Sequence, residues 1–173
     1  MRPTLYNVEQ IGSGRLSIMG RPRAGDWAAD EFAGLRELGV THVVSLLEDS
    51  EACELGLRDE GAYCESAGLR YRSFPIADRG VPASAQTLSR LACQLYHECA
   101  GGAHAAIHCR AGIGRSGLVA AAVLLHCGFE VDEAFAAISR ARGVAVPDTL
   151  EQAAWLKTHR AAINECHLAR LGF

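Results

Sequence analysis

The chain has 173 residues, of which 49% are hydrophobic and 21% are charged, and its formal net charge at pH 7 is −3. This length suffices for one hydrophobic core, and the composition excludes a disordered or fibrous protein. The weak net charge also excludes the strongly basic field that binds nucleic acid or an anionic membrane surface, so we expect neither as a partner.

The amino-terminal sequence and the cysteines bear on the compartment. The first 20 residues contain no apolar core of the length that a secretory signal requires, and no later stretch has the pattern of a membrane span. The seven cysteines are an odd number and include no CxxC pair, which predicts free thiols in a reducing compartment. We therefore expect a cytoplasmic protein that forms one domain over residues 1–173, with a core of about residues 14–165.

Short apolar runs alternate with longer helical patterns in the first half of the chain. Strands are predicted over residues 16–20, 41–47 and 69–76. A helix is predicted over residues 26–38, with Asp26 as its N-cap and Gly39 as its stop signal. The segment 50–67 has the pattern of one helix or of two short ones.

The second half continues the alternation. Helices are predicted over residues 84–100, 114–128, 131–142 and 147–163. A loop rich in Asp, Gly and Pro covers residues 77–84, a buried strand is predicted over 103–108, and Asp148 is the predicted N-cap of the last helix. The predicted fold is therefore a single α/β domain with a mostly parallel central sheet flanked by helices.

The segment HCRAGIGRSG, residues 108–117, joins the strand predicted over 103–108 to a nearly wholly apolar helix. Residues 109–115, which we call the cradle loop, include Gly112 and Gly114, and glycine allows the backbone to approach a ligand closely. Successive N–H groups of such a loop can point inward, and the following helix adds partial positive charge through its dipole. The cradle loop is thus predicted to bind an anion, at the edge where parallel sheets place their ligands.

Four side chains around this loop have predicted chemical roles. Arg115 can hold two oxygens of a phosphate with its planar guanidinium. The same positive field favours the thiolate form of Cys109, which would make it a nucleophile for phosphoryl transfer. Ser116 can donate its hydroxyl to the sulfur, and His108, whose side chain should point away from that of Cys109, is predicted to orient the site.

The pattern HCxxxxxRS, formed by His108, Cys109, Arg115 and Ser116, resembles the phosphate-binding loop of the cysteine-dependent protein tyrosine and dual-specificity phosphatases. The segment PIADRGVP, residues 75–82, is similar to the general-acid loop of the kinase-associated and other compact dual-specificity-like phosphatases. The resemblance, which extends from GRPRAGDW to about Gln152, implies hydrolysis of phosphomonoesters through a phosphocysteine intermediate, without a metal or another cofactor. The phosphate would be bound by residues Arg110, Ala111, Gly112, Ile113, Gly114 and Arg115.

A phosphocysteine mechanism also needs a proton donor for the leaving group. Asp78 lies in the loop 77–84, which we call the acid loop, and the resemblance makes it the general acid. Glu48 and Asp49, which also follow a predicted strand, are reserve candidates, although they equally well cap the next helix. Gln152 matches the place where related phosphatases often carry a glutamine, which could orient the hydrolytic water.

The favoured substrate is a phosphorylated protein, because Arg110 is the only cation of the cradle loop before Arg115, and lipid phosphatases typically carry more. Arg79 and Arg110 flank the predicted pocket and would favour acidic or multiply phosphorylated substrates. Lipid, nucleotide and RNA phosphates stay open as substrates, and the oligomeric state is open too.

Two other functions fit parts of the pattern. A rhodanese-like sulfurtransferase also places a cysteine on a cradle loop, but its chemistry does not call for His108 and Asp78. A catalytically inactive phosphate-binding module would need only the binding half of the site. A metal site is not predicted, because HEC at residues 97–99 and CH at 166–167 lack the spacing of zinc ligands.

Overall fold

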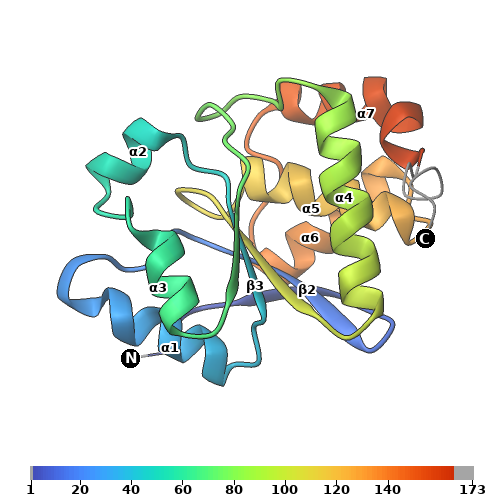
Figure 1. Cartoon of the computed structure of the whole chain (residues 1–173). Helices are drawn as coiled ribbons and strands as arrows, with labels where there is room; N and C mark the ends of the chain where they lie inside the picture. Colours follow the sequence, from blue (N-terminus) through green and yellow to red (C-terminus); the bar gives the residue numbers. More distant parts are fainter. Residues whose placement is uncertain (1, 166–173) are drawn as a thin grey trace.

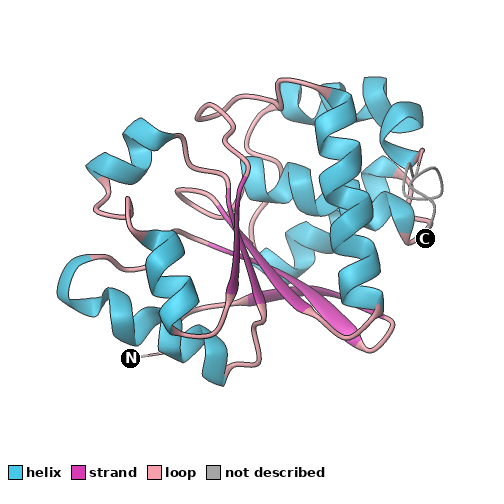
Figure 2. Cartoon of the chain, in the orientation of Figure 1, coloured by secondary structure: helices cyan, strands magenta, loops and turns pink. Residues whose placement is uncertain are grey.

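The computed structural model describes residues 2–165 and contains a five-stranded sheet with the strand order β1-β2-β5-β3-β4. The strands are β1 (Tyr6–Ile11), β2 (Gly14–Met19), β3 (His42–Ser45), β4 (Arg70–Ser73) and β5 (His104–His108). Strands β2, β5, β3 and β4 run parallel, and β1 pairs with β2 in the antiparallel sense. The predicted α/β fold with a mostly parallel central sheet is confirmed (Figure 2).

Helices cover both faces of this sheet (Figure 1). One face carries the short 3₁₀ helix η1 (Gly25–Trp27), α1 (Ala28–Glu37) and α3 (Glu60–Ser66), and α2 (Asp49–Glu54) follows β3. The other face carries α4 (Ala85–Ala100), α5 (Arg115–His126), α6 (Val131–Arg142) and α7 (Leu150–Asn164). The alternation of side chains along a strand divides the core between the two faces: Ala106 packs with Phe32 and Leu35, whereas its neighbour Ile107 packs with Leu118.

Helix α5 is buried over eleven of its twelve residues, from Arg115 to Leu125. A helix that is apolar on all sides must be surrounded, and α5 lies against β2, β5, α4, α6 and α7. Because α5 begins at Arg115, its N-terminus is fixed beside the carboxyl ends of the parallel strands. The packing of this one helix therefore sets the position of the cradle loop that precedes it.

The structure differs from the predicted strands at both edges of the sheet. Strand β1 is not predicted from the sequence, because its residues YNVEQI form an edge strand paired on one side, and all of them except Ile11 are exposed or half-buried. Strand β4 ends at Ser73 rather than at residue 76. The backbone nevertheless stays tied to β3, since the N–H groups of Phe74 and Ile76 donate to the carbonyls of Ser45 and Leu46.

Two predicted helix caps are wrong. Asp26 lies inside η1, and the N-cap of α1 is Trp27, without a side-chain hydrogen bond. The N-cap of α7 is Thr149 rather than Asp148, because Thr149 and Gln152 satisfy each other's backbone N–H groups in a capping box. The segment 50–67 forms two helices, and Gly56, with φ of 69°, lies in the break between them.

Cysteine chemistry also departs from expectation at one position. Cys53, Cys64, Cys99, Cys109 and Cys127 are free thiols, but Cys93 is disulfide-bonded, so the prediction of free thiols is wrong there. Residues 166–167, considered above as metal ligands, lie outside the described residues. Within residues 2–165, no helix has the length and apolar character needed to cross a membrane.

Candidate functional site

The cradle loop runs from the end of β5 to the first residue of α5 and is held from its outer side. The carbonyl oxygens of Ala111 and Gly112 accept hydrogen bonds from Arg142, at 3.2 and 3.1 Å, and that of Arg110 accepts one from the Arg21 N–H. Within residues 2–165, the backbone N–H groups of residues 110–114 donate no hydrogen bond. A run of unpaired N–H groups on the inner side of a loop is an anion-binding arrangement.

Gly112 is required by this loop geometry. Its φ is 70°, which disfavours residues with a side chain, and an added Cβ would lie 2.5 Å from the carbonyl carbon and oxygen of Met19. The loop can therefore lie directly against the end of β2 only with glycine at this position.

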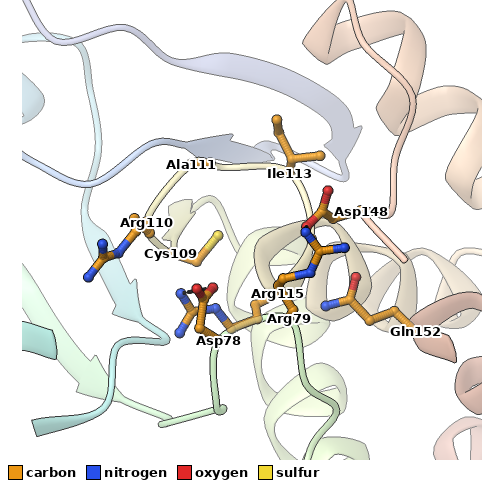
Figure 3. A pocket seen from close by; sticks show the side chains of 10 residues that line it. Asp78, Arg79, Cys109, Arg110, Ala111, Ile113, Arg115, Asp148 and Gln152 are labelled. Carbon is orange, nitrogen blue, oxygen red and sulfur yellow. Dashed lines mark hydrogen bonds and ion pairs between the residues drawn. The ribbon is translucent and has the colours of Figure 1, made fainter. Parts of the chain in front are cut away.

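Cys109 lies at a cavity of about 210 Å³, whose lining also includes Asp78, Arg115 and Gln152 (Figure 3). The side chain is 3% exposed, and its Sγ lies 3.4 Å from Ser116 Oγ in the first turn of α5. The sulfur therefore sits beside a hydroxyl, a guanidinium and the unpaired N–H groups of the loop.

Arg115 is fixed by a buried network. Its Nη1 donates to Glu51 Oε2 at 2.6 Å and to the Ile76 carbonyl at 2.8 Å, and its Nη2 donates to Glu51 Oε1 at 3.0 Å. Burial, the largest single effect, lowers the pKa of Arg115, but the hydrogen bonds with Glu51 and the charges of Cys109, Glu51 and Asp78 together outweigh it, so that the pKa is raised overall. The Arg115 hydrogen bond in turn lowers the pKa of Glu51 against the effect of burial. The guanidinium is thus a permanent positive charge in a fixed orientation.

The acid loop is folded onto the site. Asp78 Oδ1 accepts a hydrogen bond from Arg115 Nη2 at 2.9 Å, and just over half of the Asp78 side chain, 56%, is exposed. The next residue, Arg79, has φ of 57°, and the Gly80 carbonyl accepts a hydrogen bond from Gln152 Nε2 at 3.0 Å. These two features turn the acid loop so that the Asp78 carboxyl faces the cavity.

His108 lies behind the nucleophile and faces the opposite side of the sheet from the Cys109 side chain. Its Nε2 is 2.6 Å from Glu60 Oε1 on α3, and both side chains are almost completely buried, at 0% and 1% exposed. Its Nδ1 lies 3.5 Å from the Cys109 carbonyl. The pair therefore fixes the backbone at the point where β5 enters the cradle loop.

The structure brings most of the predicted site residues together. Asp78, Arg79, Cys109, Arg110, Ala111, Ile113, Gly114, Arg115 and Gln152 line one cavity, together with Asp148, which was predicted only as a helix cap. Ser116, Gly112 and His108 support the loop from outside the lining. The Gln152 amide, predicted to orient the hydrolytic water, is largely occupied by other hydrogen bonds, since its Oε1 accepts from the Thr149 N–H and its Nε2 donates to the Gly80 carbonyl.

The reserve acids Glu48 and Asp49 are not in the cavity lining. Glu48 is the N-cap of α2, in a capping box with Glu51, and Asp49 is the first residue of the helix. Glu48 and Asp49 therefore lie at the start of a helix, as the alternative interpretation predicted.

Three residues that support the site from outside the cavity lining were not predicted from the sequence. Glu51 carried one usable signal, its capping-box spacing from Glu48, but this spacing does not reveal the contact with Arg115. Glu60 and Arg142 carried no signal, because their partners are 48 and 30 or 31 residues away in the sequence.

Comparison with known proteins gives a family match. The family model Tc-R-P, described as "Polymorphic toxin system, DSP-PTPase phosphatase", matches residues 17–129. A comparison with curated protein sequences gives no match.

Three solved structures are similar over nearly the whole chain. Kinase-associated phosphatase, with its catalytic-site cysteine substituted by serine, has a TM-score of 0.84 at 19% identity, covering 94% of this chain and 97% of its own. A mutant form of Tk-PTP is 31% identical with a TM-score of 0.70, covering 87% and 92% of the two chains. PTPMT1 in complex with PI(5)P has a TM-score of 0.72 at 21% identity, covering 96% and 99%.

Proposed function

Because the chain belongs to the Tc-R-P family of DSP-PTPase phosphatases, we propose that it hydrolyses phosphotyrosine, phosphoserine or phosphothreonine in proteins, with Cys109 as the nucleophile. Membership makes the chain a cysteine-dependent phosphatase, and the proposal concerns its substrate class and the roles of individual residues. One observation carries it: the Cys109 sulfur shares a cavity with Arg115 and Asp78, at a loop whose N–H groups at 110–114 are unpaired.

In the first step the Cys109 thiolate attacks phosphorus, so that an S–P bond forms and the bond from phosphorus to the leaving oxygen breaks. Asp78 transfers its proton to that oxygen, which departs as an alcohol or phenol. Arg115 and the N–H groups of the loop stabilise the equatorial phosphate oxygens, where charge is concentrated in the transition state. Arg115 Nη2, which donates to Asp78 Oδ1 in this structure, would then donate to a phosphate oxygen instead.

In the second step water attacks the phosphocysteine, the S–P bond breaks, and the Asp78 carboxylate accepts the proton of the water. Ser116, at 3.4 Å from the sulfur, donates a hydrogen bond to the departing thiolate. Gln152 keeps the acid loop in place through Gly80, and the second hydrogen of its amide is available to the attacking water. The two steps need no metal, because the positive charge is supplied by Arg115 and the loop dipoles.

A phosphoprotein is favoured over a lipid headgroup by the surroundings of the two flanking arginines. Arg110 lies 3.3 Å from Glu54 and 3.6 Å from Glu51, and Arg79 lies 3.7 Å from Asp148. Both guanidinium groups are therefore partly neutralised by carboxylates, which weakens their attraction for the several phosphates of a phosphoinositide. The compartment proposed is the cytoplasm, because Cys109 must stay reduced throughout the reaction; the disulfide at Cys93 would be the exception there among the described cysteines.

The two alternative functions are not favoured. The chemistry of a sulfurtransferase does not require a carboxyl group such as that of Asp78 at the cavity of the nucleophile. A phosphate-binding module requires neither Asp78 nor the Cys109 sulfur. The family description supports a phosphatase over both.

A panel assay tests the substrate class. We expect the wild type to hydrolyse phosphotyrosine and phosphoserine peptides faster than short-chain phosphoinositides, and Cys109→Ser to bind the same peptides without turnover. Turnover of any substrate by Cys109→Ser at the wild-type rate would refute Cys109 as the nucleophile. A strong preference for phosphoinositides would refute the phosphoprotein assignment.

The role of Asp78 has a separate test. For Asp78→Asn we expect kcat to fall by about 10²- to 10⁴-fold with phenyl phosphate, whose leaving group needs a proton. The loss should be much smaller with para-nitrophenyl phosphate, whose leaving group is stable as an anion. Asp49→Asn, which changes the reserve candidate, should stay within twofold of wild type; equal losses of Asp78→Asn with both esters would contradict a general-acid role.

A further inference from the structure

A second cavity, of about 290 Å³, borders the cradle loop on the side of β1 and β2. Four arginines line it, Arg2, Arg21, Arg23 and Arg142, together with a single carboxylate, Glu31. They come from the segment before β1, the segment after β2 and the end of α6. We call this cavity the arginine cleft.

The arginine cleft carries an excess of positive charge. Glu31 is paired with Arg23 at 2.6 Å, so it neutralises one of the four guanidinium groups. The side chains of Arg2 and Arg21 make no ion pair or hydrogen bond with any other part of residues 2–165. Two guanidinium groups that have no carboxylate partner therefore face the same space.

Arg142 connects the cleft to the cradle loop. Its guanidinium lies 4.2 Å from the centre of the Tyr6 ring and donates to the carbonyls of Ala111 and Gly112. These contacts fix the guanidinium in place, since the planar group is stacked on one face and hydrogen-bonded at its edge. Its positive charge remains, because a ring and two neutral carbonyls do not cancel it.

The cleft and the Cys109 cavity are neighbours across one residue. Ala111 lines both cavities. The Arg21 N–H is hydrogen-bonded to the Arg110 carbonyl at 3.2 Å, so the segment that carries Arg21 is attached to the loop itself. A substrate whose phosphate is bound by the cradle loop can therefore place a nearby group over Ala111 and into the cleft.

We propose that the arginine cleft binds a second phosphate, carried by the same polypeptide as the phosphate that is hydrolysed. The inference rests on the proposed phosphoprotein phosphatase function and narrows it to doubly phosphorylated segments. A phosphate dianion matches the surplus charge of Arg2, Arg21 and Arg142 better than a single carboxylate does, and the guanidinium fork suits its oxygens.

The test uses three peptides that share one phosphotyrosine and differ at a position one to three residues away, which is alanine, glutamate or phosphothreonine. We expect the phosphothreonine peptide to have a kcat/KM about tenfold above the alanine peptide, mainly through KM, with glutamate between them. In Arg21→Ala this ratio should fall to near one. In Arg90→Ala, which removes an exposed arginine on α4, it should keep the wild-type value.

The outcomes separate this proposal from the function on which it rests. Hydrolysis of all three peptides with equal kcat/KM would leave the phosphatase function intact and overturn the cleft as a subsite. An equal loss on all three peptides in Arg21→Ala would overturn it too, since that pattern reports damage to the cradle loop. Binding of inorganic phosphate is titrated in Cys109→Ser with and without Arg21→Ala. If Arg21→Ala weakens this binding but leaves the kcat/KM ratio of the phosphothreonine and alanine peptides unchanged, the cleft binds a separate anion and the proposal is wrong.

Discussion

Glu51 fixes the orientation of the Arg115 guanidinium, the proposed phosphate ligand. Both of its carboxylate oxygens are bonded to the guanidinium, and the Arg115 side chain is only 2% exposed. Removing one partner of such a pair leaves a buried charge uncompensated, which typically costs about 3–5 kcal/mol. The orientation of the guanidinium toward the cavity would be lost with it.

For Glu51→Gln we therefore expect a lower free energy of unfolding and a fall in kcat/KM of about 10²-fold. A glutamine amide has one acceptor oxygen, so it can replace only one of the two carboxylate oxygens that accept hydrogen bonds from the Arg115 guanidinium. The control is Glu54→Gln on the same helix, which removes an exposed carboxylate 3.3 Å from Arg110. Such a surface pair contributes about 1 kcal/mol at most. Urea unfolding and steady-state kinetics measure both effects; similar results for the two variants would show that Glu51 has no special role.

The free thiols differ sharply in their surroundings. Burial, reinforced by the charge of Glu60, raises the pKa of Cys64 to about 12, and burial raises the pKa of Cys99 to about 11. Both are therefore protonated and unreactive at neutral pH, whereas Cys109 lines a cavity together with the Arg115 guanidinium.

We expect iodoacetate, itself an anion, to alkylate Cys109 at pH 6.5 faster than the exposed Cys53, and to leave Cys64 and Cys99 unmodified. Added phosphate should protect Cys109 and leave the rate at Cys53 unchanged. Peptide mapping by mass spectrometry reads all four sites. Faster modification of Cys53 than of Cys109 would argue against a thiolate in the cavity.

At the scale of elements, the junction of β2, the cradle loop and α5 leaves no room for a side chain at residue 112. Gly112 and Gly128 both have positive φ, at 70° and 90°, but an added Cβ at Gly112 meets the Met19 backbone, while at Gly128 it meets nothing within 4 Å. A side chain at Gly128 would therefore cause backbone strain alone, whereas a side chain at Gly112 would cause backbone strain and a steric conflict with the end of β2.

Gly128→Ala should cost about 1–2 kcal/mol through its φ alone and keep wild-type turnover. Gly112→Ala should cost more, and it should lower kcat/KM by at least tenfold, since the loop must move away from β2 and Met19. Unfolding free energies and kinetics of the two variants provide the comparison. Equal stability losses with normal turnover in both would mean that the loop accommodates a side chain at residue 112.

At the scale of the whole molecule, three histidines from separate elements tie stability to pH. Burial is the main cause that lowers the pKa of His42 on β3, His104 on β5 and His126 on α5 below the usual 6.5. The unfolded chain then takes up protons at a higher pH than the folded chain does. Their contribution to stability is therefore complete above pH 6.5 and is lost as the pH falls toward the folded-state values.

We expect the Tm to decrease as the pH is lowered from 7.5 to 5, with a further decrease below pH 4.5 as Glu51, whose pKa is lowered in the folded state, becomes protonated in the unfolded chain. Circular dichroism melts over both pH intervals measure the Tm. His126→Gln should reduce the slope between pH 6.5 and 5. A Tm that stays constant or rises over that interval would contradict the assignment.

The sequence by itself determined the features that depend on neighbouring residues. The alternation of strand and helix patterns predicted the α/β class, and the order from His108 to Ser116 predicted the cradle loop. A strand, a glycine-bearing loop and a helix N-terminus in succession leave few arrangements to the chain, so Cys109 and Arg115 are close wherever this segment folds. Asp78 was found through family resemblance, since its position thirty-one residues before Cys109 has no local signature.

The tertiary structure alone decided which distant groups support that loop. Glu51 reaches Arg115 across 64 residues, Glu60 reaches His108 across 48, and the arginine cleft combines residues 2, 21, 23 and 142. These pairings depend on the strand order β2-β5-β3 and on the register of parallel strands, which bring together the ends of segments separated in sequence. A glutamate on an amphipathic helix has the same local pattern whether it faces solvent or a buried guanidinium, and only packing against the sheet distinguishes the two.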